Sequence, residues 1–439
     1  MPDNEKSQQG QANSSTKSSM TTVYLLTTVP FIMVLGNSML IPVLPAIQKA
    51  IHINLFQAGL LITFFSIPAG IIIPFAGLLS DHIGRKKVMA PALIIYGVGG
   101  ILAGLASVMF KNSFPYILGA RIIQGIGAGG TYQLAMALIG DLIQGKQRAQ
   151  ALGILEASNG LGKVVSPLAG AVIALITWYM PFFVYGVLAL PIAAIVYFLA
   201  KEPQNKQKAQ STKEYLQGLK KIWSKKGPSL LSAFLAGTLV LFALFGLLSY
   251  LSDKLEAAKL GTFSRGLVIA IPVLFMAITS YILGTVLKSS LAKILKITTI
   301  VGLVFVSGGL VGFMLFSSNF LRVSAASLLG VGTGLVLPSL NTLITSAASA
   351  SERGLVTCLY GTVRFFGVAI GPPVFGLADK LSRPAVFLGS AGLAAIAAII
   401  VGFVINVKKV LPPEMLKGGG KQIEKNAQST PLGGKIKLK

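Results

Sequence analysis

Glu156 and Lys163 are two charged residues in a stretch that is otherwise apolar or small, ILEASNGLGKVVSPLAG (residues 154–170). They are seven positions apart, which is two turns of an α-helix, so both project from one face with Asn159 between them. The glutamate could carry a proton, and the lysine could either keep it ionised or bind an anionic substrate. The alternative is a structural ion pair of Glu156 with Lys163 or Arg121. Ionisable groups within membrane spans are functional by default, which favours proton coupling.

Composition places these charges in a membrane. Of the 439 residues, 53% are hydrophobic and 12% are charged, whereas soluble domains carry about 25% charged residues. Twelve apolar runs are long enough to cross a bilayer, which takes about 20 residues. Backbone polar groups in lipid must be bonded internally, so these runs form helices and we expect an all-α integral membrane protein. The twelve predicted transmembrane helices are residues 22–46, 55–79, 88–110, 114–142, 149–174, 180–200, 229–252, 264–287, 297–316, 321–346, 353–378 and 384–405.

The two halves of the chain resemble each other at an offset of 205 residues. GIGAG (125–129) aligns with GVGTG (330–334), and Arg148 aligns with Arg353. Six predicted helices precede a charged central segment and six follow it, so we expect two pseudo-symmetric six-helix bundles. This is a transporter architecture, with the substrate site near the bilayer midplane between the halves. The expected divisions are a disordered tail (1–20), an N-terminal bundle (21–200), a basic linker (201–228), a C-terminal bundle (229–406) and a basic tail (407–439).

Polar residues within the spans are the candidates for substrate contact. Arg364 occupies the position that Asn159 has in the first half, where a cation could contact an anionic substrate or pair with an acid across the halves. Asn37 is the one strongly polar side chain of the first span, so it either bonds a neighbouring helix or contacts substrate. The predicted substrate site is therefore Asn37, Asn159, Lys163 and Arg364.

Basic residues exceed acidic ones by 38 to 13, which gives a net charge of +25. They gather in alternate loops and in the C-terminal tail. By the positive-inside rule, we predict a multi-pass protein of the plasma membrane with both termini in the cytoplasm. Nucleic-acid binding would need a folded basic domain outside the spans, and none is left over, so we expect no nucleic-acid partner.

The loop after the second span carries a recognisable motif. GLLSDHIGRKKVM (77–89) resembles the signature loop of the major facilitator superfamily, although it departs from that pattern at Ser80 and His82. The matching positions include Gly77, Asp81, Gly84 and Arg85. The resemblance implies that Asp81 and Arg85 form a latch that holds the two halves closed on the inner side. The glycines would allow the turn and a close approach.

Two further stretches resemble motifs of proton-driven members of this superfamily. LGARIIQGIGAG (118–129) is similar to the span-4 motif, whose arginine, here Arg121, takes part in proton transfer. GKVVSPLAGA (162–171) is similar to the span-5 antiporter motif, although two expected glycines are replaced, and GVAIGPPVFG (367–376) is its second-half copy. The positions expected to bend or seal these spans are Gly162, Pro167, Gly371 and Pro372.

The resemblance covers essentially the whole chain between the tails. LIPVLPAI (40–47) is similar to the end of span 1 in the drug:proton antiporter branch. The resemblance implies a secondary transporter that exports small amphipathic compounds, such as drugs, by proton antiport with alternating access. Alternatives are export of an endogenous anionic metabolite such as a siderophore, flipping of a lipid-linked molecule, proton-symport uptake, or a non-transporting membrane sensor. Many relatives carry a carboxylate in span 1; this chain has none, which concentrates the proton role on Glu156.

No enzyme constellation is present. The two histidines, His52 and His82, and the single Cys358 provide neither a metal site nor an activated nucleophile. The chain has no P-loop, so ATP is not its energy source. We therefore expect no enzyme, no metal and no cofactor. Because one chain contains both halves, we expect a monomer whose partners are a small-molecule substrate, protons and the lipid bilayer.

Overall fold

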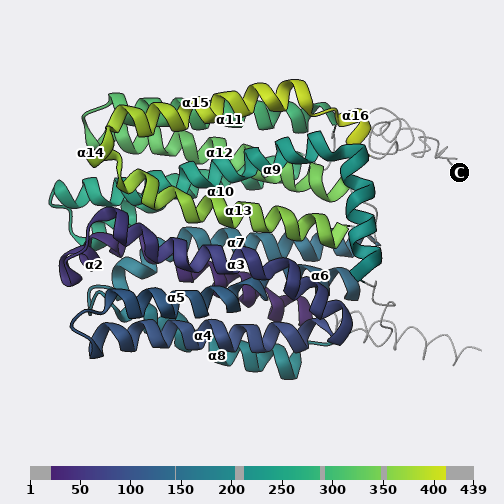
Figure 1. The fold of residues 1–439 in the computed structure, drawn as a ribbon, viewed down its shortest axis with the longest axis horizontal. Coiled ribbons are helices and arrows are strands. Elements are labelled where there is room, and N and C mark those ends of the chain that lie inside the picture. Colours follow the sequence, from purple (N-terminus) through teal and green to yellow (C-terminus); the bar gives the residue numbers. More distant parts are fainter. Residues whose placement is uncertain (1–20, 144, 203–211, 287–291, 348–352, 412–439) are drawn as a thin grey trace, which may run out of the picture.

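Long helices make up nearly all of the computed structural model, which describes residues 21–143, 145–202, 212–286, 292–347 and 353–411. They lie side by side along one direction, and the described residues contain no β-strand (Figure 1). The first helix covers residues 21–38. The other elements are η1 (Ile41–Val43), α2 (Leu44–Ile51), α3 (Leu55–Ile83), α4 (Arg85–Met109), α5 (Phe114–Gly129), α6 (Tyr132–Leu142), α7 (Gly145–Ile173), α8 (Met180–Leu199), α9 (Thr212–Ala257), α10 (Thr262–Val286), α11 (Ala292–Leu315), α12 (Asn319–Ala347), α13 (Arg353–Gly376), α14 (Ala378–Leu381), α15 (Arg383–Val404) and α16 (Val407–Val410).

Eleven segments of the described residues are long and apolar enough to cross a membrane. Helices α5 and α6 together form one of them, with a break at Thr131. The twelfth long helix is α7, with 29 residues. It falls short on apolarity because it carries Glu156 and Lys163 among its charges. The expected all-helical membrane fold is confirmed, and its least apolar long helix is the one in which we predicted the site.

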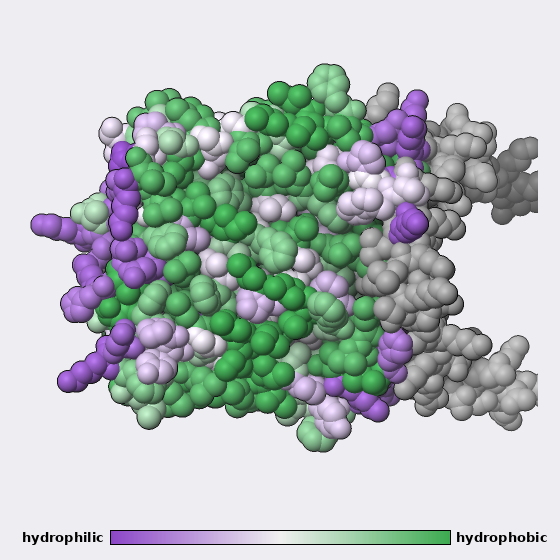
Figure 2. Space-filling model, viewed as in Figure 1, coloured by the Kyte–Doolittle hydropathy of each residue, from purple (hydrophilic) through white to green (hydrophobic). Residues whose placement is uncertain are grey.

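The surface of the bundle has the pattern of a membrane protein. On the face that Figure 2 shows, apolar residues cover the middle, while hydrophilic residues collect at the two ends. We call one end the terminal end, because Thr22 bonds Lys201 there and Lys226 bonds the carbonyl of Val410. The opposite end, where α2 and α14 lie, is called the far end (Figure 1).

Helix α9 begins earlier than the sequence predicted. The segment 201–228 was expected to be a linker, but residues 212–228 are already helical and form the first turns of α9. Figure 1 shows this part running across the terminal end of the bundle rather than along the other helices. Pro228 lies inside the helix, and a proline removes one backbone hydrogen bond and so permits a bend there. The other expected divisions of the chain stay predictions.

Helices α3 and α13, from opposite halves, pack closely over much of their length. Thr63 Oγ1 donates to the carbonyl of Ala369 at 2.5 Å, and Thr362 Oγ1 donates to the carbonyl of Gly70 at 2.8 Å. A Cβ on Gly59 would lie only 2.6 Å from the backbone of α13. Small residues permit such close approach between membrane helices. The cavity described below therefore has a closely packed wall on this side.

Polar contacts join the two halves at the far end. Gln48 Nε2 donates to Asp253 Oδ1 at 3.3 Å, and Lys49 pairs with Glu256, which also pairs with Arg265. Gln48 and Asp253 are 205 positions apart, so equivalent positions of the two halves meet here. The Arg265 side chain is 2% exposed and that of Lys49 is 72% exposed. These contacts close the far end between the halves.

We expect Glu256→Gln to destabilise the protein and Lys49→Gln to have little effect. Loss of the carboxylate leaves the Arg265 charge buried and unpaired, which typically costs about 3 to 5 kcal/mol. An exposed pair such as that of Lys49 contributes about 0 to 1 kcal/mol. The measurement is the midpoint of thermal unfolding of each purified variant. Equal midpoints for the two variants would contradict the importance of the buried pair.

Candidate functional site

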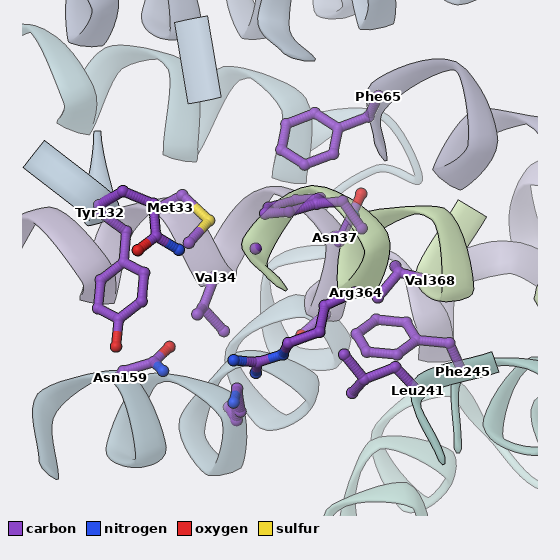
Figure 3. A pocket seen from close by; sticks show the side chains of 15 residues that line it. Met33, Val34, Asn37, Phe65, Tyr132, Asn159, Leu241, Phe245, Arg364 and Val368 are labelled. Atoms are coloured by element: carbon purple, nitrogen blue, oxygen red, sulfur yellow. The ribbon is translucent and has the colours of Figure 1, made fainter. Parts of the chain in front are cut away.

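A cavity with about 650 Å³ of empty space lies between the two halves, near the middle of the helices. The first helix, α3, α6 and α7 line it on one side, and α9 and α13 on the other. Its polar lining residues are Asn37, Ser38, Tyr132, Gln133, Asn159, Lys163 and Arg364, and the rest are apolar or glycine. All four predicted substrate contacts are thus brought to one cavity, part of which is shown in Figure 3.

Helix α7 turns one face toward this cavity. Asn159 and Lys163 line the cavity, and Glu156 precedes Asn159 by three positions, which places all three side chains on one face of the helix. Leu161 on another face is 58% exposed and belongs to the apolar belt. Charged side chains in a span are expensive in lipid and face the protein interior. The polar side chains of α7 therefore lie on the face that points away from lipid, toward the cavity.

Glu156 is held by neutral hydrogen-bond donors. The Tyr132 hydroxyl donates to Oε1, and Asn159 Nδ2 donates to Oε2 at 3.1 Å. Within the described part of the chain, the carboxylate takes part in no ion pair, so the structural pair with Lys163 or Arg121 is not formed. Sequence reasoning missed Tyr132, which lies 24 positions from Glu156 on another helix. No sequence signal marks it as a partner.

Two cations face the cavity from opposite halves, Lys163 on α7 and Arg364 on α13. The Arg364 guanidinium lies over Tyr360, with Cζ 5.3 Å from the ring centre. Its Nε is buried and has no hydrogen-bond partner among the described residues. Glu156 and Arg364 are both close enough to Lys163 for their charges to act on it. With all three groups ionised, this part of the cavity carries a net positive charge.

Arg121 lies apart from this group and is fully buried in the first half. Its guanidinium donates to the carbonyls of Leu61 and Gly36 at 2.8 and 2.9 Å, to Gln124 Oε1 at 2.6 Å, and to Asn37 Oδ1. None of its described hydrogen bonds goes to a carboxylate. Arg121 thus ties the first helix, α3 and α5 together, and the contacts of Arg121 do not reach Glu156. Its part in proton transfer stays a prediction.

Arg121→Gln is expected to lower the midpoint of thermal unfolding by several degrees. The shorter amide cannot make all of these bonds, and a buried acceptor left unsatisfied, such as Asn37 Oδ1, costs about 1 to 3 kcal/mol. Lys87→Gln, at an exposed position, is the control and should leave the midpoint unchanged. A variant of Arg121 that unfolds like the wild type but no longer couples transport to protons would show proton transfer instead of anchoring.

The predicted latch residues meet at the terminal end. Arg85 Nη2 lies 2.5 Å from Asp81 Oδ1, and Arg85 Nε lies 3.2 Å from Asp141 Oδ2. Arg85 Nη1 donates to Ser80 Oγ at 2.6 Å. Ser80, a departure from the signature motif, is therefore a partner of its arginine, and Asp141 is a partner that sequence reasoning did not assign. All four residues belong to the first half.

The glycines of this loop have distinct structural roles. Gly84 has φ +114°, which side chains rarely adopt, and a Cβ there would lie 2.5 Å from the Glu202 carboxylate. It caps α4 after the turn that the motif predicted. A Cβ on Gly77 would lie 3.3 Å from Cys358 Sγ on α13, so Gly77 packs across the halves. A latch function for the loop stays a prediction.

The predicted hinge positions lie where α7 and α13 touch their neighbours. A Cβ on Gly162 would be 3.4 Å from the first helix, and one on Gly371 would be 2.3 Å from the backbone of α9. The Pro167 carbonyl oxygen would be 2.9 Å from a Cβ on Gly266 of α10. On the other side, a Cβ on Gly59 of α3 would be 2.8 Å from the Pro372 carbonyl carbon. Each proline, at equivalent positions, therefore packs against the opposite half.

Comparison with known protein families identifies the family of this helical bundle. The pattern that defines the Major Facilitator Superfamily matches residues 26–372. The chain belongs to the major facilitator superfamily. A solved bacterial homologue of the human lysosomal transporter Spinster, inward-facing and unoccupied, superposes on this superfamily member with a TM-score of 0.71. The match covers 90% of this chain and 99% of that chain at 18% identity, so the fold of two pseudo-symmetric six-helix bundles is confirmed.

Two relatives of this superfamily member come from Bacillus subtilis (strain 168). The bacillibactin exporter is 36% identical over 393 residues, which cover 89% of this chain and 98% of that protein. Multidrug resistance protein 2 is 26% identical over 390 residues, which cover 86% of this chain and 94% of that protein. The chain is therefore a multi-pass membrane transporter of small molecules and not an enzyme, as the sequence predicted.

Proposed function

We propose that this major facilitator protein is a secondary active exporter that moves small amphipathic compounds out of the cell in exchange for protons. The observation that carries the proposal is the carboxylate of Glu156, which lies mid-helix beside the cavity and is bonded by the neutral Tyr132 and Asn159. It can gain and lose a proton without breaking an ion pair. The relatives named as exporters of bacillibactin and of multiple drugs support the outward direction.

Protonation of Glu156 would change the wall of the cavity. The ionised carboxylate accepts hydrogen bonds from Tyr132 and Asn159, two residues that line the cavity. A protonated carboxyl is neutral and is a donor at one oxygen, so the hydrogen bond accepted at that oxygen is weakened. Proton uptake thereby moves side chains that border the substrate, which is the differential interaction that a proton-coupled transporter requires.

Alternating access would use the contacts between the halves. Opening the far end would separate Gln48 from Asp253 and break the Lys49–Glu256 pair, whereas α3 and α13 would remain packed. Asp81 and Arg85, with the glycines of their loop, would form the latch at the terminal end. The two proline contacts of α7 and α13 would act as the hinges of these motions.

We place the chain in the plasma membrane with both termini in the cytoplasm. Most of the lysines and arginines fall in the loops and the tail of one side, as the positive-inside rule requires for a cytoplasmic face. The terminal end would then face the cytoplasm and the far end the outside. A single chain supplies both walls of the cavity, which supports a monomer.

The proposal is tested by flux in proteoliposomes that contain the purified wild-type protein. Bacillibactin and the cationic dye ethidium are the two substrates, because relatives named for bacillibactin and for multiple drugs are both known. With the membrane potential clamped at zero, we expect at least one of the two compounds to accumulate only under an imposed pH gradient, and this accumulation to collapse when nigericin dissipates that gradient. A membrane sensor would show no flux, and a symporter would accumulate substrate under the opposite gradient.

A further inference from the structure

Two basic side chains from opposite halves face the same cavity without an acid between them. Lys163 comes from α7 and Arg364 from α13. The described residues offer neither of them an ion pair, and the nearest carboxylate of the site, Glu156, is occupied by Tyr132 and Asn159. Figure 3 shows the Arg364 guanidinium extending into the cavity toward the α7 wall that carries Asn159.

Arg364 differs in this respect from the two fully buried arginines. Arg121 donates hydrogen bonds to two carbonyls and to side chains. Arg265 also has a buried Nε without a hydrogen-bond partner among the described residues, but its charge is paired with Glu256. The Arg364 Nε is buried and has no partner in the described part of the chain. Buried charges are normally paired, because removing them from water is costly. The unmet donor, on a cation that no acid of the described residues pairs, therefore points to an anionic ligand.

We propose that Lys163 and Arg364 together form a subsite for the negatively charged group of the transported compound. The guanidinium is a planar fork that suits a carboxylate or sulfonate, and the lysine adds a compact second charge. This inference rests on the proposed transport function and adds a substrate class to it. The compound is an organic anion.

The apolar lining of the cavity indicates the chemical character of the uncharged part of this anion. Phe65, Leu241, Phe245 and Phe365 line it beside the two cations. Aromatic and aliphatic walls favour an apolar and preferably aromatic body through burial of its surface and ring contacts. The class is therefore an aromatic acid with one end charged and the other apolar.

The anion also has a defined relation to Glu156. With the carboxylate ionised, Lys163, Arg364, Glu156 and a bound monoanion sum to zero charge. A proton on Glu156 removes a negative charge and so strengthens the hold on the anion instead of expelling it. Because this attraction by itself favours binding of the anion and the proton together, the proposed exchange requires that the transporter with both bound does not change the side to which it opens. The return step then carries positive charge, which an inside-negative membrane potential pulls inward.

The test compares two probes of the same shape, 1-naphthalenesulfonate and the neutral 1-naphthalenesulfonamide. Their binding is measured by equilibrium dialysis to the full-length protein in nanodiscs of uncharged lipid, with empty nanodiscs subtracted. We expect the wild type to prefer the sulfonate. Lys163→Met and Arg364→Gln should each weaken sulfonate binding by about tenfold to a hundredfold and leave sulfonamide binding unchanged. Arg364→Lys keeps the positive charge but loses the planar guanidinium, so its affinity for the sulfonate should lie between those of the wild type and Arg364→Gln.

Control variants separate this inference from the proposed function. Lys111→Met removes an exposed cation outside the cavity and should change neither affinity. Glu156→Gln should bind the sulfonate at least as tightly as the wild type, whether or not Glu156 couples transport to protons. The inference is overturned if the wild type does not bind the sulfonate, binds both probes equally, or if its preference survives in both Lys163→Met and Arg364→Gln.

Discussion

Glu156→Gln is expected to abolish proton-driven accumulation of substrate while leaving its passive equilibration intact. The amide has nearly the same shape as the carboxylic acid, and its oxygen can still accept a hydrogen bond from Tyr132. The fold and the cavity should therefore survive. The variant cannot bind or release a proton at this position, so the two directions of the cycle are no longer tied to the pH gradient.

The measurement is the accumulation ratio in proteoliposomes under a pH gradient of two units with the membrane potential clamped at zero. Each pH unit contributes about 1.4 kcal/mol per proton, so the wild type has a limiting ratio of about a hundredfold at one proton per cycle. The variant should reach a ratio of one. Glu424→Gln, which changes an acid in the C-terminal tail, should behave like the wild type. Full accumulation by the Glu156 variant would make its carboxylate structural.

The second large effect concerns the membrane potential. We expect export of an anion in exchange for one proton to move two charges per cycle, because the anion leaves and the proton enters. A potential of 100 mV supplies about 2.3 kcal/mol per charge, which multiplies the limiting accumulation ratio by about fifty for each charge moved. Without a pH gradient, the wild type should therefore respond to the potential as a two-charge carrier.

This charge count is measured with 1-naphthalenesulfonate at several potentials set by potassium and valinomycin. The slope of the logarithm of the accumulation ratio against potential gives the charges moved per cycle. Glu156→Gln should halve the slope, since the anion then moves without a proton. Arg364→Gln should keep the slope of the wild type but slow the flux. A slope of one charge for the wild type would contradict proton exchange.

The fold could be predicted because lipid imposes a simple rule on sequence. Every apolar run became a helix, and the repeat at an offset of 205 placed equivalent residues at equivalent sites, as Pro167 and Pro372 show. The start of α9 could not be predicted in the same way. Residues 212–228 are polar, so they lack the apolar signature of a span, and their helix is set by local propensity and its continuation into α9.

The charged residues of the candidate site could be predicted from the sequence, whereas their partners could not. Lys163 and Arg364 stand out because a charge in an apolar helix is expensive, and both line the cavity. Tyr132 and Asp141 could not be identified as partners, since an aromatic residue in a span and an acid at a helix end are ordinary. Their roles depend on which helices pack together, and that is a property of the three-dimensional arrangement.

The contact between Gln48 and Asp253 has a consequence for how two similar halves came to differ. Two identical half-chains related by a two-fold axis would bring this position against its own copy, as in an isologous homodimer. Two aspartates there would repel each other. Fusion into one polypeptide frees the two copies to diverge, so that an amide can donate to a carboxylate. The neighbouring pair of Lys49 and Glu256 shows the same asymmetry. At this contact both acids, Asp253 and Glu256, belong to the second half.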